Sequence, residues 1–135
     1  MKKKNACLEF ADQRSESLIR NFRESIARQS QISAMRAFED AANAPAPRFW
    51  VSESRAARIV SMMLKGEDPT EGMHVEKRKM YVEICRRVKE EMAKLPSRPL
   101  GDIVFDVVNS PAPSSYMTIS NARHIIYSRR RSITK

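Results

Sequence analysis

The sequence predicts an all-α protein built from two tandem copies of a three-helix unit. Three observations lead to this fold class. Good helix formers such as Ala, Arg, Lys, Glu and Met are plentiful, and the 135 residues include only three glycines, too few for a turn-rich β fold. Apolar residues recur at helical spacing in several segments. The sequence also matches itself at an offset of 66 residues.

The internal repeat is clearest around two Pro-Ala-Pro segments. Residues 43–60 and 109–126 are identical at seven of 18 positions, and most other changes are conservative, such as Trp50 to Tyr116. Apolar positions also coincide upstream without a gap. The expected organisation is a first copy over 12–66, a linker over 67–75, a second copy over 76–131, and flexible basic ends at 1–11 and 132–135.

The first copy is expected to hold a long helix, a short helix and a third helix. Apolar side chains four residues apart predict the long helix, over about 12–29. A second apolar stripe predicts the short helix, which ends near Asn43. Prolines then hold the connector extended. Ser52 is a suitable N-cap for the third helix, and Gly66 suits its end.

The second copy repeats this plan, with one ambiguous element. Apolar residues line its first helix, which Pro96 ends, and Thr118 is the expected cap of its third helix. The β-branched run over 103–108 favours a strand by propensity. Alignment with the Ala-rich short helix of the first copy favours a helix instead. The sequence leaves both alternatives open.

The net charge of +9 makes contact with a polyanion the leading functional hypothesis. The excess is shared between the halves: residues 1–66 contain 12 Lys/Arg and seven Asp/Glu, and residues 67–135 contain 13 and nine. The stretch from 109 to 135 differs from the rest because it has five Lys/Arg and no acidic residue. Such a stretch favours an anionic partner.

Several function classes find no support in the sequence. Catalysis needs a nucleophile, a base or a metal held in a pocket, and neither His74 nor His124 has an acid or Cys at useful spacing. Cys7 and Cys85 lack neighbouring ligands, and three glycines cannot form a phosphate-cradling loop. We therefore expect no enzymatic activity, no cofactor, no bound metal and no small-molecule substrate.

The sequence also favours a cytoplasmic protein. No apolar run approaches the roughly 20 residues needed to span a bilayer. The basic start is followed by a segment with acidic residues, where a signal peptide would need an apolar stretch. No contact with a membrane is expected.

The outer face of each third helix is the candidate nucleic-acid site. A capped helix with small residues near its start and arginines on its outer face resembles the last helix of the helix-turn-helix plan, which enters the major groove. The likeness is loose, because the connector over 43–51 is longer than the usual turn of three or four residues. The candidate contacts are Arg55, Arg58 and Lys65 in the first copy, and Arg123, His124, Arg129, Arg130 and Arg131 in the second.

This resemblance implies a regulatory or architectural protein that binds double-stranded DNA. Small size, basic charge and the lack of catalytic groups are also similar to small proteins encoded by prophages and mobile elements. The alternative is a helical protein-interaction module or a homodimer, in which Trp50 and Tyr116 form aromatic surface patches. The same aromatics also fit a structural role, packed on the helices that follow them. RNA binding ranks third, because aromatic residues are few.

Overall fold

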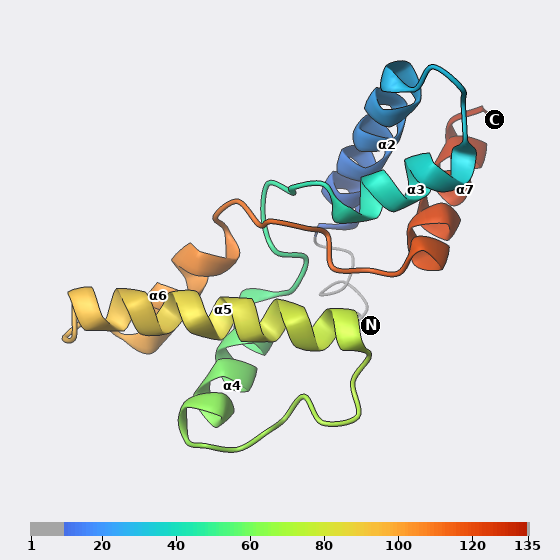
Figure 1. The fold of residues 1–135 in the computed structure, drawn as a ribbon. Coiled ribbons are helices and arrows are strands. Elements are labelled where there is room, and N and C mark those ends of the chain that lie inside the picture. Colours follow the sequence, from blue (N-terminus) through green and yellow to red (C-terminus); the bar gives the residue numbers. More distant parts are fainter. Residues whose placement is uncertain (1–9, 135) are drawn as a thin grey trace. The chain divides into compact units, whose positions relative to one another are not determined.

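The computed structural model describes residues 10–134, and within them it contains six α-helices and no strand. The all-α fold class is therefore confirmed. In chain order the helices are α2 (Ala11–Arg28), α3 (Ala34–Asn43), α4 (Glu53–Leu64), α5 (Val75–Lys94), α6 (Leu100–Val108) and α7 (Ile119–Thr134) (Figure 1).

The helix ends agree with the predicted caps. The Ser52 Oγ accepts the Arg55 N–H at 3.2 Å at the start of α4, and the Thr118 Oγ1 accepts the Asn121 N–H at 3.0 Å at the start of α7. Gly66, two residues past α4, has a φ of 91°, which glycine adopts without strain. Helix α7 runs to Thr134, past the predicted end at 131.

The ambiguous run over 103–108 lies within helix α6, so the strand alternative is wrong. Its buried residues are Ile103, Val104, Val107 and Val108. This i, i+1, i+4, i+5 spacing puts all four on one face of a helix, whereas a strand would divide them between two faces. Packing of that face outweighs the β propensity of the side chains.

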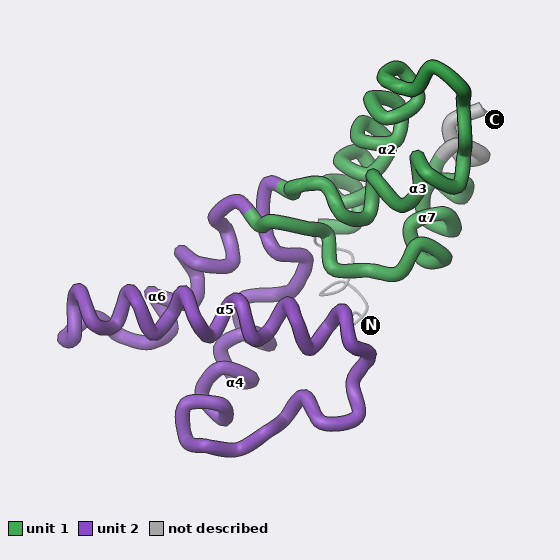
Figure 2. The backbone as a smooth tube through the Cα atoms, in the orientation of Figure 1, with its two compact units in different colours: residues 1–46, 112–135 green, residues 47–111 purple. Residues whose placement is uncertain are grey.

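The six helices form two compact units (Figure 2). Unit 1 comprises residues 1–46 and 112–135 and holds α2, α3 and α7, whereas unit 2 comprises residues 47–111 and holds α4, α5 and α6. Each unit thus takes two helices from one predicted copy and its third helix from the other. This grouping differs from the predicted division at 12–66 and 76–131. Residues 67–75, expected to link two units, lie inside unit 2 between α4 and α5.

The cores explain why each unit needs the exchanged helix. In unit 1, Ala122, Ile125 and Ile126 of α7 pack in one buried cluster with residues of α2 and α3, namely Leu18, Ile19, Phe38, Ala41 and Ala42. In unit 2, α4 packs on both α5 and α6, and its residues Ala56, Ile59 and Val60 are buried. Without the third helix, the apolar faces of the other two would be exposed to water.

Equivalent backbone hydrogen bonds hold the two connectors. In unit 2 the Phe49 N–H donates to the Val108 carbonyl at 2.9 Å. In unit 1 the Ser115 N–H donates to the Ala42 carbonyl at 3.1 Å. Each of these residues has its counterpart 66 positions away. Ala46 and Ala112 also exchange two N–H to carbonyl bonds of 2.9 Å, which form an isolated antiparallel bridge.

The exchange predicts that a cut in the loop between α4 and α5 leaves the two fragments bound to each other. A protease site inserted after Gly72, an exposed loop residue, allows this cut. The fragments should co-elute in size-exclusion chromatography under native conditions, because each unit contains helices from both. They should separate only in denaturant. Separation in native buffer would contradict the exchanged packing.

Candidate nucleic-acid interface

The predicted contact residues fall into two groups, one in each unit. Arg55, Arg58 and Lys65 lie on or just after α4 in unit 2. Arg123, His124 and Arg129 lie on α7 in unit 1, followed on the same helix by Arg130 and Arg131, whose side chains lie outside the described part. The two groups therefore have to be considered separately.

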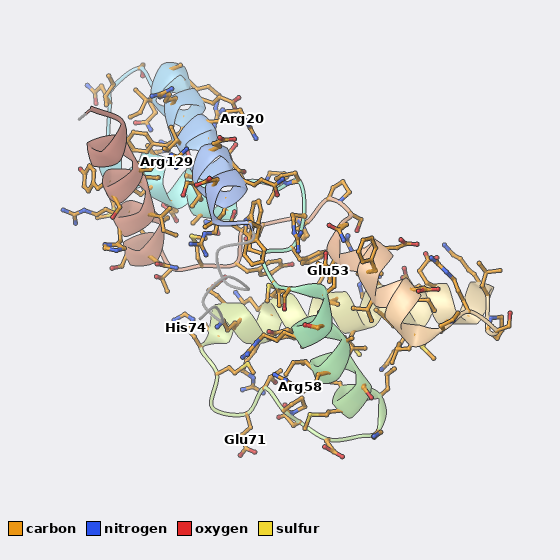
Figure 3. The ribbon with its side chains drawn as sticks, turned by 180° about the vertical axis from the view of Figure 1, so that it is seen from behind. Arg20, Glu53, Arg58, Glu71, His74 and Arg129 are labelled. Carbon is orange, nitrogen blue, oxygen red and sulfur yellow. The ribbon has the colours of Figure 1, made fainter. Side chains whose placement is uncertain are left out.

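The group on α4 is only partly available to a ligand. The Arg55 side chain is exposed, but its Nε donates to the Tyr81 hydroxyl at 3.1 Å. Arg58 and Lys65 are exposed (Arg58 is labelled in Figure 3). The loop that follows α4 is acidic, with Glu67, Asp68 and Glu71. These carboxylates weaken the positive potential at this end of unit 2.

The outer face of α7 is more favourable to an anion. Its exposed side chains are Ser120, Asn121, Arg123, His124, Tyr127 and Ser128. The Arg123 guanidinium lies over the Tyr127 ring, 5.6 Å from its centroid, which limits its freedom. No residue of α7 is acidic. This face offers cations and hydrogen-bonding groups, with no carboxylate on the helix to oppose them.

Arg129 has a structural role in addition to its charge. Its guanidinium forms ion pairs with Asp12 at 3.0 Å and Glu16 at 3.9 Å, both on α2 (Arg129 is labelled in Figure 3). The Arg129 side chain is 31% exposed. These contacts join α7 to α2, so part of the Arg129 charge is already balanced within unit 1.

Sequence reasoning missed four arginines of unit 1. Arg20, Arg23 and Arg28 on α2 and Arg36 on α3 are exposed, and none forms an ion pair with another described residue. Arg20 and Arg23 line a hollow of about 410 Å³ that Arg129 of α7 also lines, together with the acidic Glu16 and Glu24. These arginines become candidate contact residues only because α7 packs on α2, and the sequence does not reveal this packing.

Because of the exchange of helices, the net positive charge is divided unevenly between the two units. Among the described residues, unit 1 contains nine Lys/Arg and five Asp/Glu, whereas unit 2 contains 12 and 10. The two halves of the sequence are nearly equal in net charge, but the two units are not. Unit 1 therefore carries most of the positive excess.

The cations of unit 2 are largely paired within it. On α5, Arg86 contacts Glu83 and Glu90 at 2.8 and 2.6 Å, and Arg87 contacts Glu83 at 2.7 Å. Further pairs join Arg78 to Asp68, Lys79 to Glu76, Lys94 to Glu91 and Arg98 to Asp106. The hydrogen bonds from Arg86, and then those from Arg87, lower the pKa of Glu83 to about 2.

The lowered pKa predicts that Glu83 stabilises unit 2 above pH ~4.5 and that this contribution is lost as the pH falls toward 2. The substitution Glu83→Gln should lower the free energy of unfolding by about 1 kcal/mol at pH 7, a small value because Arg86 is solvent-screened. The difference from the unchanged protein should shrink at pH 3. Urea unfolding at both pH values measures it. Glu71→Gln, in an exposed loop, is the control, and an equal effect there would contradict the assignment.

The aromatic candidates are not open surface patches. Trp50 and Tyr116 are each half-buried and each has interaction partners within the protein. Tyr116 also has a φ of 54°, in the left-handed region that few non-glycine residues adopt. These features agree with connector residues fixed by their surroundings.

In comparisons with known proteins, the chain matches no protein-family model, no curated protein and no solved structure. No described helix is both long and apolar enough to cross a membrane. Within residues 10–134, no group of three or more His, Cys, Asp or Glu side chains is arranged to hold a metal ion.

Proposed function

We propose that the protein binds double-stranded DNA in a regulatory or architectural role and that unit 1 provides the main contact. One observation carries this proposal. The exposed face of α7 has no carboxylate, and α7 belongs to the unit whose described residues include nine Lys/Arg and five Asp/Glu. Duplex DNA is the polyanion that such a helix face fits, because its major groove admits an α-helix.

The two kinds of side chain on unit 1 suit different parts of a duplex. Arg123 and Asn121 on α7 can form bidentate hydrogen bonds with guanine and adenine edges. Arg20 and Arg23 on α2 can bind phosphates, which fix the orientation of a protein on DNA without reading sequence. His124 adds a hydrogen-bonding group on the α7 face.

In this proposal the connection between the helices differs from that of the helix-turn-helix plan. In that plan a short turn joins the second and third helices of one unit. Here α3 and α7 pack together in unit 1 but are far apart in the chain. We keep α7 as the recognition helix and give α4, through Arg58 and Lys65, a secondary role. We further propose that the protein acts in the cytoplasm and without catalysis.

A second candidate function is a protein-interaction module. Four large apolar side chains of unit 2 are more than half exposed: Val75 at 55%, Val82 at 56%, Leu95 at 54% and Phe105 at 54%. Exposed apolar groups of this size are suited to a protein partner. These side chains differ from the Trp50 and Tyr116 patches expected from the sequence, and an interaction through them becomes the leading candidate if DNA does not bind.

The proposal predicts salt-dependent binding to duplex DNA that depends on unit 1. Fluorescence anisotropy with a labelled duplex, at several salt concentrations between roughly 50 and 200 mM, gives the slope of log affinity against log salt. The double substitution of Arg20→Ala with Arg23→Ala should make this slope shallower by about 2, since each lost phosphate contact accounts for about 0.9.

A matched control tests whether the location is correct. Lys77→Ala with Lys89→Ala removes two exposed cations from unit 2 and the same total charge. This control should change the slope little. An equal loss from both double variants would contradict the placement on unit 1. No binding at about 50 mM salt would contradict DNA binding altogether, and a matched RNA duplex tests the remaining nucleic-acid partner.

A further inference from the structure

A polar hollow lies where α2 turns into α3 in unit 1. Its volume is about 430 Å³, within the range of ligand sites. Arg28 from the end of α2 and Arg36 from the first turns of α3 line it, together with Ser30 and Gln31 of the turn between them. Both arginines are exposed, and neither forms an ion pair with a described residue.

The remaining polar groups of the hollow are fixed by hydrogen bonds to one another. The Gln29 Oε1 accepts the Ser33 N–H at 2.6 Å, and the Gln29 Nε2 donates to the Ser25 Oγ at 3.1 Å. The Ser25 hydroxyl in turn donates to the Asp40 Oδ2 at 2.6 Å. This chain of bonds holds the wall of the hollow in place and gives the Asp40 carboxylate a partner. The guanidinium groups of Arg28 and Arg36 therefore remain available to bind a ligand.

The equivalent corner of unit 2 has a different chemistry. The positions of Ser25, Arg28 and Arg36 are occupied there by Glu91, Lys94 and Asp102, each 66 residues later. The Lys94 ammonium is paired with Glu91 at 3.3 Å, and Arg98 is paired with Asp106. One corner is therefore neutralised by its own residues, whereas the other presents two arginines around a hollow. Since the backbone plan is the same, the fold alone does not require this difference.

We propose that the hollow bounded by Arg28 and Arg36 is a phosphate-binding site that holds a backbone phosphate of the bound nucleic acid. A guanidinium group presents paired N–H donors that match phosphate oxygens, and two such groups around one hollow can bind a phosphate from two sides. Ser30 and Gln31 add side-chain donors. The two arginine charges exceed the single charge of Asp40, so the site favours an anion. This inference rests on the proposed DNA binding.

The test follows backbone amide signals of ¹⁵N-labelled full-length protein by NMR. Inorganic phosphate and a short DNA duplex are added in separate titrations. Each should shift the signals of residues 28–36 in the unchanged protein. Arg28→Ala with Arg36→Ala should abolish the shifts with phosphate and make the salt slope of DNA binding shallower by about 2. Arg28→Lys with Arg36→Lys, which keeps the charge but loses the paired donors, should bind phosphate more weakly than the unchanged protein.

Lys94→Ala, at the position equivalent to Arg28, is the matched control and should leave both titrations unchanged. If DNA binds while residues 28–36 do not shift with either probe, the phosphate site is wrong and the proposed function stands. Shifts with phosphate but no DNA binding would overturn the proposed function and make free phosphate the ligand of the site. A double variant that shifts like the unchanged protein would overturn the role of the arginines, provided that circular dichroism shows it folded.

Discussion

The exchange of the third helices between the two halves of the chain determines most properties of this protein. Each unit has two helices from one half, whose apolar faces become a closed core only when a helix from the other half covers them. Burial of these faces is the main favourable term in folding, and in this structure each unit obtains it with a helix from the other half. The two connectors must therefore run between the units, and their prolines suit the extended backbone this requires. The equivalent hydrogen bonds at Phe49 and Ser115 fix each connector to the unit it enters.

Specific side chains distinguish the two third helices, although their apolar patterns are nearly the same. Phe49, just before α4, is fully buried, and the guanidinium of Arg87 on α5 lies 5.1 Å from its ring centroid. The equivalent residue before α7 is Ser115, which could not fill that space. In unit 1 the ring of Tyr127 on α7 makes a T-shaped contact with the ring of Phe38, with centroids 5.5 Å apart, and α4 has Ser61 at the equivalent position. Each helix therefore matches the unit it occupies, because exchanging them would leave a cavity on one side and crowd the other.

Local features of the structure could be predicted from the sequence, and the grouping of helices could not. Ser52 and Thr118 cap helices as expected because capping depends on neighbours within three residues. The buried stripes follow from helical periodicity in the same way. The pairing of these apolar stripes depends on residues that are far apart in the sequence. It is hard to predict here because α4 and α7 carry similar apolar stripes. The prediction of the candidate site residues depends most on this long-range packing. Arg123 and His124 were identified on α7, but Arg20 and Arg23 became relevant only through the packing of α7 on α2.

The exchange also provides a physical link between the fold and the proposed function. The third helix of the second half lacks acidic residues, and the first two helices of the first half carry exposed arginines. Had each half folded by itself, these two sets would have belonged to different units of similar net charge. The exchange places them in one unit and leaves the other with nearly balanced charges, most of them in ion pairs. Concentrated charge binds a polyanion more strongly than the same charge spread evenly, because neighbouring phosphates are neutralised together. In the proposed function, the unit whose cations are paired internally stabilises the fold, and the other unit binds the DNA.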